Sequence, residues 1–167
     1  MPSEDRGGKM NEQTIKKNDL MADIKKYLHK IGNPPLAFQR VKYYLNQYKN
    51  FTDQDVERIF ISDFVNGDEN HALRNLWFFS DTYMMEMKDF LVKQENKMDF
   101  NKFKNKITYL EITKNYDFDK EDDNSWLYVY FKLTSTIDVA GELRATGKNC
   151  GFLSNIIREI IIPNFAD

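Results

Sequence analysis

Residues 125–137, SWLYVYFKLTSTI, decide the fold class, because their apolar side chains recur at every second position. Alternate side chains of a β-strand point to opposite faces. One face would carry Trp126, Tyr128 and Tyr130, and the other would carry Leu127, Val129, Phe131 and Leu133. Since both faces look apolar, we expect a central strand that is covered on both sides.

Further segments with period two lie on either side of this strand. Residues 73–79 and 83–88 flank the short turn Ser80-Asp81-Thr82, which predicts a hairpin. Strands are also expected at 106–116 and 142–146, and the acidic segment 117–124 is expected to be an exposed loop. The apolar residues after Gly147 predict a closing helix that ends at Pro163.

The first third of the chain has a different period. Apolar residues recur every third or fourth position, which predicts helices over 18–31, 35–48 and 52–64. Pro34 and Pro35 separate the first two helices. Thr52 and Asp55 approximate a capping box at the start of the third helix, and Phe51 and Val56 are spaced as a hydrophobic staple.

The predicted fold class is therefore α+β, an N-terminal three-helix unit followed by an antiparallel sheet or partly open barrel that a C-terminal helix closes. Residues 1–10 are expected to be a disordered tail, residues 11–67 the helical unit, and residues 70–167 the sheet with its helix. Within the sheet unit, Trp77, Met84 and Trp126 are candidates for either the core or a contact surface.

Composition excludes several classes of protein. The chain has 167 residues, with 24 Lys and Arg, 26 Asp and Glu, and a net charge of −2, so a dedicated nucleic-acid-binding protein is disfavoured. A single cysteine can form neither an internal disulfide nor a multi-cysteine zinc site, and with no secretory leader we expect a cytoplasmic location. No apolar stretch approaches the ~20 residues of a membrane helix, so no stable membrane association is expected.

The strongest candidate site is the corner where the last strand meets the last helix, formed by Gly147, Lys148, Asn149 and Cys150. A helix N-terminus can hold an anion, although the glycine spacing differs from that of a phosphate loop. The same sequence is also explained without a bound anion, with Gly147 as a turn residue and Asn149 as the helix N-cap.

Cys150 is a conceivable nucleophile in the first turn of this helix, where the dipole can lower a thiol pKa. It would need a base, and nothing in the sequence places His29 or His71 beside it. A small buried thiol is the simpler interpretation. The sequence predicts no other catalytic residue, no metal site and no cofactor.

Four segments together resemble a pleckstrin-homology-like domain over residues 73–162. They are LWFFSDTYMMEMKDF, KITYLEITKNYDF, SWLYVYFKLTSTIDVAGELRAT and GFLSNIIREIII. The resemblance implies a bent antiparallel sheet closed by a C-terminal amphipathic helix. Lipid-binding members of the family use basic residues around the first hairpin turn, and Ser80-Asp81-Thr82 has none, so the resemblance implies a protein-binding scaffold.

These observations predict a non-enzymatic, cytoplasmic interaction module that binds a protein partner and no nucleic acid. The alternative is a small enzyme, or an anion- or ligand-binding domain, that uses the Gly147–Cys150 corner. The sequence predicts neither the identity of the partner nor the oligomeric state.

Overall fold

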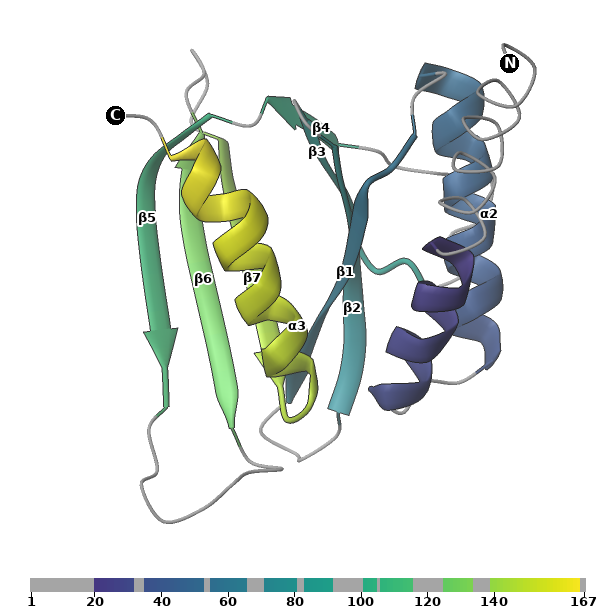
Figure 1. Ribbon diagram of the computed structural model, residues 1–167, viewed down its shortest axis with the longest axis horizontal. Helices are drawn as coiled ribbons and strands as arrows, with labels where there is room; N and C mark the ends of the chain where they lie inside the picture. Colours follow the sequence, from purple (N-terminus) through teal and green to yellow (C-terminus); the bar gives the residue numbers. More distant parts are fainter. Residues whose placement is uncertain are drawn as a thin grey trace, which may run out of the picture.

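The computed structural model describes residues 20–31, 35–52, 55–65, 71–80, 83–91, 101–104, 106–115, 125–133 and 139–165. The predicted tail 1–10 and the acidic segment 117–124 lie outside the described residues. Three layers are visible in Figure 1, with two helices on one side, a sheet in the middle and a second sheet on the other side. The protein is thus α+β, as expected.

Among the residues that the structure describes, seven strands form two antiparallel sheets. The four-stranded sheet has the order β1-β2-β3-β4, and the three-stranded sheet has the order β5-β6-β7. The strands are β1 (Arg58–Val65), β2 (His71–Phe79), β3 (Tyr83–Met87), β4 (Asn101–Lys104), β5 (Ile107–Lys114), β6 (Trp126–Leu133) and β7 (Val139–Thr146). The predicted hairpin around residues 80–82 is confirmed, because β2 and β3 pair antiparallel.

The predicted N-terminal three-helix unit is wrong, because the third of its segments is a strand. β1 replaces the helix expected over 52–64 and pairs with β2. Residues Phe60 to Asp63 are all buried, as in a strand that is covered on both faces. Because such a strand carries apolar residues at both even and odd positions, the spacing of the apolar residues also fitted a helix. Thr52 ends the preceding helix instead of capping a new one, since its hydroxyl donates to the carbonyl of Tyr48 at 2.7 Å.

The two N-terminal helices cover the four-stranded sheet. Residues 20–30 of the first helix are described, and the second, α2, spans Pro35–Thr52. The ring of Tyr48 in α2 meets the ring of Phe78 in β2 edge-on, with centroids 5.8 Å apart. The helices thereby cover the sheet face that carries Phe78, a face that would otherwise expose apolar side chains to water.

The other face of the four-stranded sheet packs against the three-stranded sheet. Trp77 of β2 is fully buried, and its ring lies 6.0 Å from the ring of Phe131 in β6. Gly141 in β7 lies opposite Phe131, and a Cβ added there would lie 2.2 Å from the end of the Phe131 ring. Glycine is therefore required at 141 for the aromatic core between the sheets to close.

Helix α3 (Asn149–Ile156) continues through a π-helical turn (Ile157–Ile161) and a short 3₁₀ turn (Ile162–Asn164). It contacts β1, β6 and β7, and in Figure 1 it lies in front of the gap between the two sheets. Leu153 of α3 and Ile161 of the π-helical turn are fully buried. The closing helix was predicted, and it joins the two sheets. Within the described residues, no helix has the length and apolar character required to cross a membrane.

Candidate functional site

The predicted Gly147–Cys150 corner connects β7 to α3. Gly147 has a φ of 55°, a left-handed conformation that glycine adopts without strain, and its N–H donates to the Ser125 carbonyl at 2.8 Å. Lys148 is exposed and stands at the N-cap position, where its side chain makes no capping hydrogen bond. The interpretation of Asn149 as the N-cap is therefore wrong.

Asn149 points into the protein instead of toward solvent. Its side-chain amide donates to the carbonyl of Ile61 at 2.8 Å, and its oxygen accepts from the hydroxyl of Tyr27 at 2.8 Å. The N–H of Ile61 donates in turn to the Tyr27 hydroxyl at 2.9 Å. Burial raises the pKa of Tyr27, so its hydroxyl stays protonated. The three residues form a buried polar cluster that joins the first helix, β1 and α3.

This cluster occupies a special position in the fold. β1 and β7 are the facing edge strands of the two sheets, and they contact each other without forming one continuous sheet. The N–H of Arg144 in β7 donates to the Ser62 hydroxyl at 2.9 Å, and that hydroxyl lies 3.3 Å from the Arg144 carbonyl. Ser62, Tyr27 and Asn149 thus supply the hydrogen bonds that a neighbouring strand would otherwise provide.

Cys150 also faces inward. Its sulfur lies 3.4 Å from the carbonyl of Ala145 and 3.6 Å from the carbonyl of Ser125, and the Ser125 hydroxyl lies 3.8 Å from the same sulfur. Burial raises the pKa of the Cys150 thiol, and the hydrogen bond with Ser125 opposes this shift only in part. A raised pKa reduces the thiolate fraction at neutral pH, which is the opposite of what a nucleophile requires.

The structure brings the four predicted residues together at one corner, but only Lys148 has an exposed side chain. The polar atoms of Asn149 and Cys150 have partners within the protein. Of the two histidines, His29 is exposed on the first helix and His71 begins β2. In the described part of the chain, no group of His, Cys, Asp and Glu could hold a metal ion.

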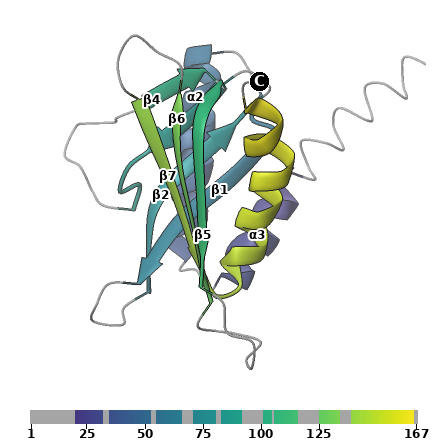
Figure 2. The ribbon, with the colours of Figure 1, turned by 90° about the vertical axis from the view of Figure 1, so that its left-hand side faces the viewer.

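A second candidate is the outer face of the three-stranded sheet, which the sequence analysis expected to be covered. Along β6, the inner side chains are buried, whereas Trp126 is 41% exposed and Tyr128 and Tyr130 are half-buried. Tyr109 of β5, opposite Lys132, is 47% exposed. In Figure 2 the three-stranded sheet lies nearest the viewer, α3 lies beside it and α2 lies behind the sheets. The expectation that β6 is covered on both faces is therefore wrong.

Strand register arranges this surface in rows. Tyr109 lies opposite Lys132, Glu111 and Glu142 lie on either side of Tyr130, and Thr113 and Arg144 lie on either side of Tyr128. We call the surface formed by these residues and Trp126 the aromatic face. Three aromatic side chains follow one another along β6, about 7 Å apart as strand geometry requires.

Charged groups contact Tyr128 and Tyr109 of the aromatic face. The Tyr128 hydroxyl donates to Glu142 at 2.9 Å, and the Arg144 guanidinium lies 4.9 Å from the centre of the Tyr128 ring. The Tyr109 hydroxyl donates to Glu111 at 3.2 Å, and this hydrogen bond raises the pKa of Tyr109. Partial burial, followed by the bond to Glu142, raises the pKa of Tyr128. Both phenols therefore remain protonated hydrogen-bonding groups at neutral pH.

The alternation in the sequence places Trp126, Tyr128 and Tyr130 on one strand face, but it does not show that this face is exposed. The charged residues could have indicated this exposure. Lys132 on β6 and Glu142 and Arg144 on β7 alternate so that they lie on the same sheet face as the three aromatic residues. Of the other candidates, Trp77 and Met84 are buried in the core. Comparison of the chain with protein-family models, with curated proteins and with solved structures finds no match.

Proposed function

We propose that this chain is a non-enzymatic interaction module that binds a protein partner through the aromatic face. The observation that carries the proposal is the row of Trp126, Tyr128 and Tyr130 on a sheet face that no described helix covers. Tyrosine, tryptophan and arginine are the residues that most often dominate protein–protein binding energy. On this face Tyr128 is held in a defined position by Glu142 and Arg144, which lowers the entropy that its side chain loses on binding.

The charge of the aromatic face favours a protein over a nucleic acid. The face carries two carboxylates, Glu111 and Glu142, and two cations, Lys132 and Arg144. Surfaces that bind nucleic acid need more cations than anions to neutralise phosphates, and on this face the two are equal in number. A balanced charge around exposed aromatic groups is typical of protein interfaces, whose cores are aromatic and whose rims are polar.

We also propose that the scaffold is pleckstrin-homology-like. The order of four antiparallel strands, three antiparallel strands and a closing helix supports this assignment. The two helices before β1 would then be an addition to the scaffold, because they cover the four-stranded sheet and leave the aromatic face exposed. We propose a cytoplasmic location, which the single cysteine supports because it excludes an internal disulfide framework.

The alternative function, ligand binding at the Gly147–Cys150 corner, has less support. The side-chain amide of Asn149 and the thiol of Cys150 already have partners inside the protein, at 2.8 Å and 3.4 Å respectively. A ligand there would have to displace these contacts or rely on Lys148 and backbone N–H groups alone.

The experiment that tests the proposed function is quantitative affinity capture from the native cell extract, with the full chain and two matched variants. Tyr109 and Tyr43 are both tyrosines with 47% exposure, and Tyr43 lies on α2, away from the aromatic face. A genuine partner should be retained by the wild type and by Tyr43→Ala. It should be reduced about tenfold or more by Tyr109→Ala or Trp126→Ala, as expected for an interface hot spot.

The direct interaction should then be measured with the purified partner. If the wild type and the Tyr109→Ala and Trp126→Ala variants capture the same proteins in equal amounts, the proposed use of the aromatic face is wrong. Thermal unfolding of each variant provides the control for folding, because exposed side chains contribute little to stability.

A further inference from the structure

The two carboxylates of the aromatic face lie at its centre. Glu111 on β5 and Glu142 on β7 both pair with Tyr130 of β6, one from each side. Neighbouring strands are about 4.8 Å apart, so the backbones that carry the two glutamates are about 10 Å apart, with the tyrosine between them. We call Glu111, Tyr130 and Glu142 the Tyr130 triplet.

The cations of the aromatic face are placed on other rings. The Lys132 ammonium lies 5.7 Å from the centre of the Tyr109 ring, and the Arg144 guanidinium lies 4.9 Å from the centre of the Tyr128 ring. Among the described residues, neither glutamate of the triplet forms an ion pair, and no cation lies over the ring of Tyr130. The triplet therefore has an aromatic ring and two negative charges without a cation of its own.

The triplet also has oxygen atoms that can bind a ligand. The Tyr109 hydroxyl donates to Oε2 of Glu111 at 3.2 Å, and the Tyr128 hydroxyl donates to Oε1 of Glu142 at 2.9 Å. The second oxygen of each carboxylate forms no hydrogen bond with a described residue, and neither does the hydroxyl of Tyr130. The bonds from Tyr109 and Tyr128 orient the carboxylates before binding, which lowers the entropy that binding costs.

The ring of Tyr130 favours a flat cation. It meets the ring of Tyr109 edge-on, with centroids 6.1 Å apart and planes at 71°, so the two rings form a corner. A cation within about 6 Å of a ring centre is attracted to the electrons of the ring. A planar guanidinium can stack on the ring while N–H groups on its two edges donate to carboxylates. A compact ammonium offers no flat surface for stacking.

We propose that the Tyr130 triplet binds an arginine side chain of the protein partner. This inference rests on the proposed function, because the triplet lies in the aromatic face. The guanidinium would stack on Tyr130 and donate to Glu111 on one side and to Glu142 on the other. Apolar side chains beside this arginine would contact Trp126 farther along β6.

A divalent metal ion fits the triplet less well than a guanidinium does. Calcium takes about six to eight oxygen ligands, whereas the triplet offers two carboxylates and one phenol. The carboxylates lie on opposite sides of an aromatic ring, an arrangement that suits a cation with an extended flat surface.

The test uses the immobilised full chain and a library of random peptides displayed on phage. Peptides that bind the wild type should contain arginine far more often than the unselected library. The most enriched sequences are then synthesised with a fluorescent label in three versions, which carry arginine, lysine or citrulline at the same position. Citrulline has nearly the shape of arginine but no charge. The citrulline peptide should bind about tenfold or more weakly than the arginine peptide, and the lysine peptide should lie between the two.

A double variant of the protein, Glu111→Gln with Glu142→Gln, tests the same contact from the other side. Glutamine keeps an acceptor oxygen for the neighbouring tyrosine and removes the charge. The variant should bind the arginine peptide about tenfold or more weakly than the wild type does, and it should bind the citrulline peptide with unchanged affinity. The four affinities form a double-mutant cycle that measures the coupling between arginine and the glutamates.

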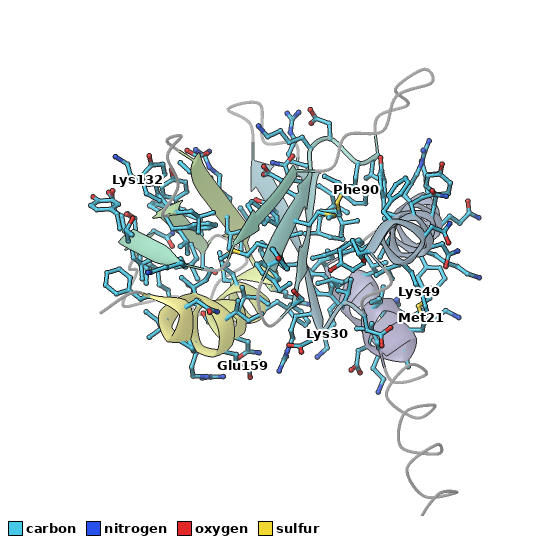
Figure 3. The ribbon with its side chains drawn as sticks, turned by 90° about the horizontal axis from the view of Figure 1, so that it is seen from above. Met21, Lys30, Lys49, Phe90, Lys132 and Glu159 are labelled. Carbon is cyan, nitrogen blue, oxygen red and sulfur yellow. The ribbon has the colours of Figure 1, made fainter. Side chains whose placement is uncertain are left out.

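The matched control is Asp23→Asn with Asp55→Asn. Both carboxylates are exposed, and neither residue lies on the three-stranded sheet. Figure 3 shows Met21, two residues before Asp23 in the first helix, at the opposite end of the molecule from Lys132 of the aromatic face. This variant should bind the arginine peptide as tightly as the wild type does. Thermal unfolding confirms that each variant is folded.

The proposed arginine contact is overturned if no peptide is enriched, if arginine is not enriched, or if the lysine or citrulline peptide binds as tightly as the arginine peptide. Additive effects of citrulline and of the double variant overturn it as well. Peptides that lose affinity for Trp126→Ala without depending on arginine would remove the arginine contact and leave the aromatic face as the binding surface. Arginine peptides that bind Trp126→Ala and the double variant as tightly as the wild type would overturn both proposals.

Discussion

Asn149 and Ile61 are 88 residues apart in the chain, and the amide of Asn149 donates a 2.8 Å hydrogen bond to the Ile61 carbonyl. Through this contact, a side chain of α3 satisfies a backbone carbonyl on the edge strand β1. The same amide side chain accepts from Tyr27, so one residue ties the closing helix, the central sheet and the first helix together. The residue proposed for ligand binding therefore has a structural role that can be measured directly.

Replacing Asn149 by Ala should lower the free energy of unfolding by about 2–4 kcal/mol, because two buried hydrogen bonds are lost and a buried backbone carbonyl loses a partner. Urea denaturation followed by circular dichroism provides the measurement. The matched control is Asn155→Ala in the same helix, where the side chain is exposed and the expected change is within about 0.5 kcal/mol. Equal effects at the two positions would contradict the role of the buried cluster.

Replacing Gly141 by Ala should lower the free energy of unfolding by about 1–3 kcal/mol, because the new methyl group would overlap the Phe131 ring. Adding Phe131→Leu should recover part of the loss, and a double-mutant cycle measures that coupling. Gly151 in α3 is the control, since a Cβ there meets no atom within 4 Å. Gly151→Ala should be neutral or stabilise the helix by about 0.5–1 kcal/mol. Additive effects of the 141 and 131 substitutions would argue against this contact.

Glu86 should make stability depend on pH in the acidic range. Burial raises the pKa of the Glu86 carboxyl in the folded protein, and its Oε2 accepts from Asn75 at 3.1 Å. The folded state then holds the proton more tightly than the unfolded chain. Stability from this group is complete below the ordinary carboxyl pKa and is lost as pH rises through the folded pKa.

Glu86→Gln removes this ionisation and keeps an acceptor for Asn75. The stability of the variant relative to the wild type should therefore be greater at pH 7 than at pH 4. The same substitution at the exposed Glu111 is the control for general charge effects. A relative stability that is independent of pH, or that falls as pH rises, would contradict the assignment.

The Cys150 thiol should react slowly with a thiol-selective reagent in the native protein. Its sulfur is buried against the Ala145 and Ser125 carbonyls, and burial raises its pKa, so little thiolate is present near pH 7. Labelling should be slower than in denaturant by on the order of 100-fold or more, because it waits for local opening. Rapid labelling at neutral pH would contradict the buried-thiol interpretation and favour the nucleophile.

The sequence predicted those elements whose pattern is local. The alternation in residues 126–133 predicted β6, and the turn at 80–82 predicted the β2–β3 hairpin. The segment 58–65 was misassigned because its consecutive buried residues fit a helix as well as a strand. Only pairing with β2 decides between them, and that information lies in another part of the chain.

The candidate corner shows the same limit. The residues around Gly147 predicted a turn there and the start of a helix after it, and both are present. The direction of the Asn149 side chain depends on Tyr27, 122 residues earlier, and on a strand edge that the sequence analysis interpreted as a helix. Exposure of the aromatic face likewise depends on where the helices pack, and the described helices lie on other sides of the sheets.

The polar contacts between β1 and β7 have a consequence for solubility. A strand edge with unsatisfied amides recruits strands from other molecules, and proteins that expose such edges form fibrous or amorphous deposits. Ser62, Tyr27 and Asn149 occupy that edge from within one chain. Substitutions that unseat them should therefore increase turbidity on heating even where the protein still folds at low temperature.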